Sequence, residues 1–487
     1  GKDLPALVAE VKLLRTVAEV HAANPAADAE RRLHALRRAK DAQRAVLGMV
    51  RLESPDVLGA QKREMAALCV EVGRYREGAK DDEGAAESYQ EALRALETHA
   101  PALLALAALH LRKNDLDRCA QQCERLLRLD QEAEAATMLL ADVLFARNEF
   151  DAATAKYQEL LGRRPNHYQA LAKLITLLRR AGRLDEVGRF LEMAEKGDPR
   201  SPSHAGLRYC RGLYHRYAND PHAAVTHFNL ARRDGEWGGH ALANLVEIYL
   251  NPDNENLWDA EGGPAAGDNA EAVRVAERLL RELNVVWPGS LKFRVLENYA
   301  YLASKQKASI DRALQNFFDL LEQEKEYVPA LLGMSVAYML DNQQNKARNT
   351  LKRIAKMPYS QDLADDFERS YLMLGDLYIQ RGKFDLAQDL CKRCLSYNKS
   401  CGKAWEAMGL MMEKEQSYED ASECYEKAWK LHHEASATVG FKLAFNHLKA
   451  KRYVEAITVC NKVLEQFPDY PKIRKEILEK AQGSLRP

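Results

Sequence analysis

Three closely spaced cysteines are the most reactive group of side chains in the sequence. The segment CKRCLSYNKSC contains Cys391, Cys394 and Cys401. Two thiolates three residues apart are able to begin a zinc site, but such a site needs further ligands at close spacing. The chain has no second C-x-x-C and no closely spaced histidine pair of the zinc-finger kind. We therefore interpret these thiols as buried packing residues, because free cysteine packs as a small apolar side chain, and we expect no metal site.

Catalytic motifs are missing from the sequence. There is no P-loop, no G-x-G-x-x-G after a strand, no H-E-x-x-H and no G-x-S-x-G. The many carboxylates are spread along helix exteriors, and no pair stands out in apolar surroundings. We expect no enzyme activity, no catalytic residue and no cofactor.

Charge and composition restrict the partners. Lys plus Arg equals Asp plus Glu at 71 each, so no global field would draw the chain to nucleic acid or anionic lipid. The basic segment 29–51 is open to interpretation as a patch for phosphate or an acidic partner, but its apolar stripe favours a solvated helix face. No apolar run approaches the roughly 18 residues of a membrane span. Nine cysteines, an odd number, indicate free thiols in a reducing compartment.

The elements that carry these residues repeat with a period of 34. Gly375 and Gly409 are separated by this interval, as are Ala387 and Ala421. Such a period, with small residues at the eighth and twentieth positions and large ones between, is that of the tetratricopeptide repeat, a pair of antiparallel helices. The residues expected to pack these pairs include Gly375, Ala387, Trp405, Gly409, Tyr418, Ala421, Tyr425, Ala428 and Ala456.

The repeat frame predicts the fold. Units are expected to start at Ala66, Ala100, Glu134, Tyr168, Ala205, Gly239, Arg294, Val328, Glu368, Gly402 and Ala437. We predict an all-α fold, a right-handed superhelical solenoid of about eleven or twelve tetratricopeptide-repeat helix pairs with a C-terminal capping helix.

Departures from the period mark the other segments. NPDNENLWDAEGGPAAGD lacks Lys and Arg and predicts a flexible acidic loop between two helices, and AKMPYSQDLADD predicts a lengthened turn. Near the end, Ile473, Ile477 and Ala481 form one stripe, as expected of a helix that caps the last unit and makes Pro487 a true C-terminus. The predicted segments are a degenerate helix pair at 1–65, repeats at 66–250, the insertion at 251–268, repeats at 269–470, and the capping helix and tail at 471–487.

The first helices of such units line an inner groove, mainly through their second, fifth, ninth, twelfth and thirteenth positions. The Lys and Asn pair that would clamp a peptide carboxylate is not found there. Phe441, Phe445 and Leu448 instead offer an apolar surface for a partner's helix or extended segment, unless the tail or a neighbouring turn covers it. The candidate groove residues are Leu372, Ile379, Lys403, Glu406, Leu410, Glu413, Lys414, Phe441, Phe445 and Leu448.

Several stretches contain turn and surface residues that the repeat does not require. Examples are PALLGMSVAYML from 329, KRCLSYNKSCGKAWEAMGLMMEKEQSYEDA from 392 and VGFKLAFNHLKAKRYVEAI from 439. From about residue 134 to its end, the chain resembles the tetratricopeptide repeat protein 21 family, which includes the large all-repeat subunit of intraflagellar transport complex A. The N-terminal part resembles the family through its period alone. Family members extend upstream, so we expect a C-terminal fragment that starts at Gly1.

The resemblance implies a non-enzymatic scaffold of the cilium or flagellum, at the axoneme and basal body on the cytoplasmic side. Its implied partners are WD40-plus-repeat subunits, a small unstructured subunit and adjacent transport-train components, with no nucleic acid and no membrane insertion. The implied roles are retrograde transport, train assembly and ciliary entry of membrane receptors. A second interpretation is a soluble adaptor that binds short peptide tails in its groove.

Overall fold

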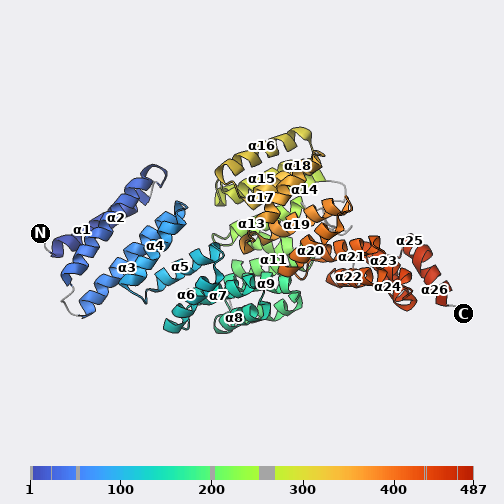
Figure 1. Cartoon of the computed structure of the whole chain (residues 1–487), viewed down its shortest axis with the longest axis horizontal. Helices are drawn as coiled ribbons and strands as arrows, with labels where there is room; N and C mark the ends of the chain where they lie inside the picture. Colours follow the sequence, from blue (N-terminus) through green and yellow to red (C-terminus); the bar gives the residue numbers. More distant parts are fainter. Residues whose placement is uncertain are drawn as a thin grey trace. The chain divides into compact units, whose positions relative to one another are not determined.

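The computed structural model describes residues 4–22, 25–50, 55–197, 203–251, 269–432, 434, 436–468 and 470–485. Within these ranges every regular element is a helix (Figure 1). None of the helices there combines the length and the apolar character that crossing a membrane requires. The chain divides into two compact units, Gly1–Arg163 and Arg164–Pro487. This division lies inside the segment of repeats predicted at 66–250.

The first unit is built from four helix pairs in chain order. Each of these helices packs against the next along the chain, as expected for stacked helix pairs. The helices are α1 (Leu4–Ala22), α2 (Pro25–Met49), α3 (Pro55–Gly78), α4 (Asp82–Ala95), α5 (Ala100–Arg112), α6 (Leu116–Leu129), α7 (Glu134–Ala146) and α8 (Phe150–Arg163).

The second unit continues with eight pairs and a terminal cap. Its helices are α9 (Tyr168–Ala181), η2 (Leu184–Glu186) with α10 (Val187–Lys196), α11 (Ala205–Tyr217), α12 (Pro221–Ala231), α13 (Gly238–Leu250), α14 (Asn269–Val286), α15 (Leu291–Ala303), α16 (Lys307–Gln323), α17 (Val328–Leu340), α18 (Gln344–Lys356), η4 (Gln361–Leu363) with α19 (Ala364–Ile379), α20 (Phe384–Tyr397), α21 (Gly402–Lys414), α22 (Tyr418–Leu431), α23 (Ala437–Lys449), α24 (Tyr453–Gln466), α25 (Pro471–Ile473), η5 (Arg474–Leu478) and α26 (Glu479–Leu485).

Short polar sequences make the turn inside each pair. Between α5 and α6, Asn114 adopts a positive φ of 58°, a conformation that asparagine tolerates better than most residues. Asp115 follows and caps α6, because its side chain accepts a hydrogen bond from the backbone N–H of Arg118. Asn219 and Asp220 repeat this arrangement before α12. These turns end one helix and start the next within three residues.

Small residues meet aromatic rings where neighbouring helices approach, either within a pair, as for Gly409 on α21 and Tyr425 on α22, or between successive pairs, as for Gly333 on α17 and Phe317 on α16. A Cβ added at Gly409 would lie 3.0 Å from ring atoms of the fully buried Tyr425, and one at Gly333 would lie 2.3 Å from the ring of Phe317. Gly375 departs from the predicted close approach, since an added Cβ there would meet no atom within 4 Å. The equivalent of Tyr425 in that unit is Cys391, whose smaller side chain leaves the space open.

The other predicted packing residues differ in their burial. Trp405 and Tyr418 are only half-buried. The indole N–H of Trp405 donates to the carbonyl of Lys399 at 3.4 Å, and the Lys427 ammonium lies 4.4 Å from the centre of its ring. The four alanines are fully buried between helices: Ala387, Ala421, Ala428 and Ala456.

The last helices cover the end of the stack. The side chains of Ile473, Ile477 and Ala481 are fully buried and join the core formed by α23 and α24. A repeat stack would otherwise leave the apolar face of its final pair in water. This terminal segment therefore completes the core of the last pair.

Most unit starts agree with the predicted frame, and four differ. Seven helices begin at the predicted residue, whereas α13, α15 and α19 begin one to four residues earlier, at Gly238, Leu291 and Ala364. The start expected at Ala66 was wrong by more, because α3 already begins at Pro55. The predicted acidic insertion, apart from Asn251 at its start, lies outside the described residues.

Candidate partner-binding surface

The predicted groove residues lie on the first helices of the last three units, α19, α21 and α23. Lys403 and Lys414 are exposed on α21. The remaining eight are half-buried, and five of those pack beside the apolar cores: Leu372, Ile379, Phe441, Phe445 and Leu448. The structure thus places these ten residues on one series of helices, with most of their apolar members in contact with the interior.

The two carboxylates of this series are engaged within the solenoid. Glu406 contacts the Nε2 atom of His432 at 3.1 Å and the Lys442 ammonium at 3.7 Å. Glu413 accepts a hydrogen bond of 2.9 Å from the side-chain amide of Asn446, which is fully buried. The contacts with Lys442 and Asn446 join α21 to α23 in the following pair, whereas His432 ends α22 in the same pair. Both carboxylates therefore stabilise the stacking of units.

Glu413 also affects a buried tyrosine. The hydroxyl of Tyr425 lies 3.4 Å from its carboxylate. Burial raises the pKa of Tyr425 above its usual range, and the negative charge of Glu413 raises it further. The tyrosine therefore stays neutral and donates its hydrogen bond.

The apolar residues of α23 are partly covered. The ring of Phe441 meets that of Tyr470, in the terminal segment, with centroids 6.1 Å apart and the rings inclined at 64°. The Lys449 ammonium lies 5.5 Å from the ring centre of Phe445. The terminal segment thus covers part of the apolar surface that the sequence suggested as a docking site. At Phe441 this favours the interpretation that the tail covers the surface over the interpretation that a partner binds there.

Helices α9, α11, α13 and α19, labelled in Figure 1, carry a second set of charged residues that was not predicted from the sequence. Arg216 on α11 forms an ion pair of 2.8 Å with Glu247 on α13, and its guanidinium also donates to the Asn244 side chain. Arg179 and Arg180 on α9 both pair with Asp365 on α19. We call these five charged residues, together with Asp366, the inner ionic surface: Arg179, Arg180, Arg216, Glu247, Asp365 and Asp366.

The contact between α9 and α19 joins two helix pairs of Arg164–Pro487 that are far apart in the chain. Arg180 and Asp365 are 185 residues apart in the chain, and Arg180 is only 2% exposed. The backbone carbonyl of Arg180 also accepts a hydrogen bond of 2.8 Å from the N–H of Lys399, in the turn between α20 and α21. The Arg179 guanidinium stacks 4.3 Å from the ring centre of Tyr217. We call this contact between α9 and the segment from α19 to α21 the α9–α19 seam.

The electrostatics of the inner ionic surface separate two adjacent aspartates. Partial desolvation by the surrounding helices opposes ionisation of Asp365, but the guanidinium groups of Arg179 and Arg180 outweigh it and hold the pKa of Asp365 well below its usual range. Burial raises the pKa of Asp366 to about 7, with the charges of Glu247 and Asp365 adding to the rise. Asp365 is thus ionised at neutral pH, whereas Asp366 gains or loses its proton close to neutral pH.

The repeat frame contained the signal for part of this surface. Arg179, Arg180 and Arg216 stand at the twelfth or thirteenth position of their units, and Glu247 stands at the ninth. These are the positions expected to face inward. Asp365 and Asp366 precede the predicted start at Glu368, in the segment interpreted as a long turn. They belong instead to the first turn of α19, because that helix begins at Ala364.

Comparison with known proteins identifies the relatives of this chain. Residues 275–482 match the C-terminal ARM domain of tetratricopeptide repeat protein 21, 134–250 match its fifth ARM repeats domain and 1–93 match its fourth. Tetratricopeptide repeat protein 21A of Mus musculus is 43% identical over the whole chain and 38% of its own length. Protein 21B of Homo sapiens is 46% identical over 93% of the chain and 35% of its length.

These two relatives are much longer than the chain, which spans little more than a third of their length. Among solved structures, the chain resembles one from the crystal structure of the APC/C hetero-tetramer Cut9–Hcn1. That match has a TM-score of 0.36 and 15% identity, and covers 97% of this chain and 90% of the other. From the matches along its length, the chain belongs to the tetratricopeptide repeat protein 21 family as a helical-repeat protein.

Proposed function

We propose that the chain is a non-catalytic scaffold, part of a subunit of intraflagellar transport complex A. In this role it supports retrograde ciliary transport, the assembly of transport trains and the ciliary entry of membrane receptors. Its partners are the WD40-plus-repeat subunits, the small unstructured subunit and adjacent train components. It acts in the cilium or flagellum, at the axoneme and basal body on the cytoplasmic side.

Family membership supports this proposal, and so does the form of the chain. A stack of helix pairs presents many similar surfaces along its length, which suits simultaneous contact with several large subunits. The longer relatives continue beyond the matched region, so the proposed contacts of this chain are a share of those made by the whole protein.

The observation that most favours a scaffold over a peptide adaptor is the engagement of Glu406 and Glu413. An adaptor for short tails needs free polar groups in its groove to fix the peptide backbone or a terminal charge. Glu406 already contacts His432 and Lys442, and Glu413 already accepts from Asn446. A peptide would have to displace these internal contacts before it gained any of its own.

Affinity purification from ciliated cells tests the proposal. The chain carries a removable tag, and the recovered proteins are quantified relative to the chain by mass spectrometry. A scaffold recovers the large WD40-plus-repeat subunits in near-stoichiometric amounts, and Glu406→Gln with Glu413→Gln leaves their recovery within about twofold if the fold is kept. Recovery of short tail peptides alone, lost in the same double variant, contradicts the proposal and favours the adaptor.

A further inference from the structure

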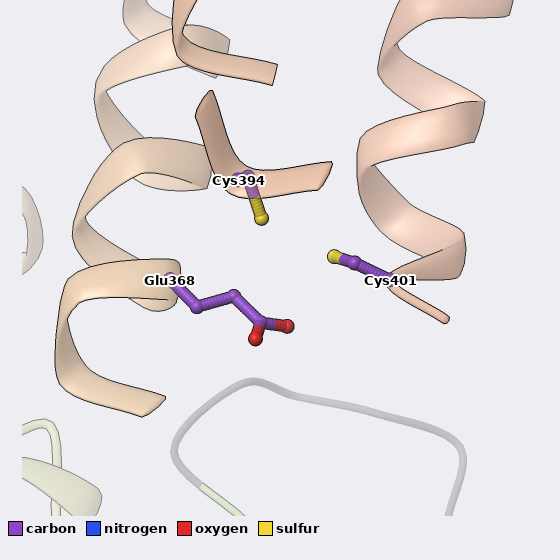
Figure 2. Close-up of side chains that lie close together, drawn as sticks. All are labelled: Glu368, Cys394 and Cys401. Atoms are coloured by element: carbon purple, nitrogen blue, oxygen red, sulfur yellow. The ribbon is translucent and has the colours of Figure 1, made fainter. Parts of the chain in front are cut away.

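Three side chains that are able to bind a metal converge beside the α9–α19 seam. They are Glu368 from α19, Cys394 from α20 and Cys401 from the residue before α21, and one ligand atom from each lies within 4.8 Å of the other two. Figure 2 shows the two sulfur atoms and the carboxylate turned toward a common centre. In the described part of the chain, this is the one such group of three or more.

A buried amide fixes the carboxylate of this group. Asn398, 1% exposed, donates a hydrogen bond of 2.8 Å from its side-chain nitrogen to Oε2 of Glu368. The side-chain oxygen of Asn398 is held in turn by the backbone N–H and the hydroxyl of Ser400, at 3.1 and 2.9 Å. This hydrogen bond fixes the orientation of the Glu368 carboxylate, and Asn398 donates no hydrogen bond to its second oxygen, Oε1. Metal ligands are commonly positioned by such outer hydrogen bonds.

The backbone between the two cysteines is fixed as well. The N–H of Asn398 donates to the carbonyl of Cys394 at 2.9 Å, and the N–H of Cys401 donates to the carbonyl of Asn398 at 3.3 Å. The intervening Lys399 donates its N–H to Arg180 on α9. The two thiols are therefore held close together by a turn that is itself anchored to the seam.

The distances suit a small thiophilic cation. Tetrahedral zinc has Zn–S distances of about 2.3 Å and Zn–O distances of about 2.0–2.2 Å, which place two sulfur ligands about 3.8 Å apart. The two sulfur atoms lie at most 4.8 Å apart, so they would have to approach each other by about 1 Å or less to bind zinc. Thiolate ligands favour zinc over magnesium or calcium, which prefer oxygen.

The surrounding charge favours the loaded state. Two thiolates and a carboxylate carry three negative charges, and zinc leaves a net charge of minus one. The Arg179 guanidinium interacts electrostatically with both Glu368 and Cys401, so a cation is already in place to balance that remainder.

We propose that Glu368, Cys394 and Cys401 form a zinc-binding site that joins α19, α20 and α21 beside the seam with α9. Water completes the tetrahedral coordination, and the two thiol protons are released when the metal binds. The site lies between two successive units, so occupancy stabilises their stacking and the closure of the second unit. It does not depend on the function proposed above.

Metal content measured on the whole chain tests this site. The tag is removed, the chain is purified with and without one equivalent of Zn²⁺, and bound zinc is measured by elemental mass spectrometry. Co²⁺ serves as a second probe, because cobalt bound by thiolates gives visible and near-ultraviolet absorption bands that cobalt bound by oxygen lacks. We expect one zinc per chain and a thiolate–cobalt spectrum.

Variants locate the ligands. Cys394→Ser and Cys401→Ser should each lower zinc affinity at least tenfold, and Glu368→Gln should also weaken it. Cys391→Ser is the matched control, because Cys391 is equally buried on α20 but lies outside the group, and it should keep full affinity. Zinc should raise the melting temperature of the original chain and of the Cys391 variant, but not that of the Cys394 variant.

Three results would overturn the site. The first is an unsubstituted, folded chain that takes up neither zinc nor cobalt. The second is equal loss of zinc affinity in the Cys391 control. The third is the appearance of a Cys394–Cys401 disulfide under mild oxidation with no metal uptake by the reduced chain, which would make the pair a redox element instead.

Discussion

Replacement of Asp365 by asparagine tests the closure of the second unit. The substitution keeps the size of the side chain and removes its charge, leaving the guanidinium groups of Arg179 and Arg180 without their common partner. Arg180 is 2% exposed, so its own guanidinium has little access to water once it loses this ionic partner. We expect α9 and α19 to separate more readily.

The size of the effect follows from the geometry. Arg179 and Asp365 lie 3.4 Å apart, which corresponds to about 5 kcal/mol at an effective dielectric constant of 20 and to about 1 kcal/mol in bulk water. Removing one partner of a fully buried pair costs about 3–5 kcal/mol. Because the Asp365 side chain is 54% exposed, water screens the pair, and we expect a loss of about 2 kcal/mol.

The effect has a defined pH dependence. The pKa of Asp365 is lower in the folded chain than in the unfolded chain, so its contribution is present above the unfolded pKa of about 4. That contribution is lost as the pH falls below this value. The difference between the original chain and Asp365→Asn should therefore be largest near pH 7 and should diminish under acidic conditions.

Hydrogen exchange followed by mass spectrometry is the assay, because a long repeat protein need not unfold in two states. A loss of about 2 kcal/mol speeds exchange through local opening about thirtyfold in Tyr168–Ala181 and Ala364–Ile379. Asp117→Asn, which removes the partner of Arg147 at a side chain that is 94% exposed, should change exchange little. Unchanged exchange in both seam helices of Asp365→Asn would refute the closure.

Three further substitutions test the packing and the electrostatics. Gly333→Ala should destabilise by about 1–3 kcal/mol, because the new Cβ would lie 2.3 Å from the fully buried Phe317, whereas Gly375→Ala has room and should stabilise α19 by about 0.5–1 kcal/mol. Ile477→Ala should cost about 2–4 kcal/mol and first release the terminal segment, as measured by denaturation and limited proteolysis. Asp366→Asn should raise the melting temperature more at pH 8 than at pH 4. Because the pKa of Asp366 is raised to about 7, this residue holds a proton in the folded chain between about pH 4 and pH 7 that it has lost in the unfolded chain. The stability of the folded chain therefore falls as the pH rises through this range, by about 1–2 kcal/mol after screening.

Each of these expectations has an opposite outcome. If Gly333→Ala and Gly375→Ala change the stability equally, the conclusion that, of these two glycines, only Gly333 lies against an aromatic ring is contradicted. Proteolysis that begins elsewhere in Ile477→Ala would mean that the terminal segment does not cap the stack. A melting temperature for Asp366→Asn that is lowered equally at both pH values would mean that Asp366 is ionised in the folded chain.

The repeat frame predicted the helix pairs because their packing is local. A small residue at the eighth position and an aromatic one at the twenty-fourth, as in Gly409 and Tyr425, meet within one unit, and the same interval recurs in the next. The terminal stripe of Ile473, Ile477 and Ala481 was visible for the same reason. Helix starts without this periodic signal, such as Pro55 for α3, were placed wrongly.

The α9–α19 seam could not be predicted from one sequence. Arg180 and Asp365 are 185 residues apart, and their meeting depends on small rotations accumulated over the intervening units. The group around Cys394 shows the same limit. The thiols at Cys394 and Cys401 are evident in the sequence, but the carboxylate of Glu368 joins them from the preceding helix, and no second cysteine or histidine motif marks that contribution.

Hydrogen exchange on a reconstituted complex tests the central claim, that the chain is a scaffold, most directly. The chain is measured alone and after binding to purified WD40-plus-repeat subunits of intraflagellar transport complex A. The scaffold account predicts protection over several separate helix pairs, with little change at Glu406 and Glu413. Protection confined to the first helices α19, α21 and α23, and reproduced by one short peptide, would contradict it.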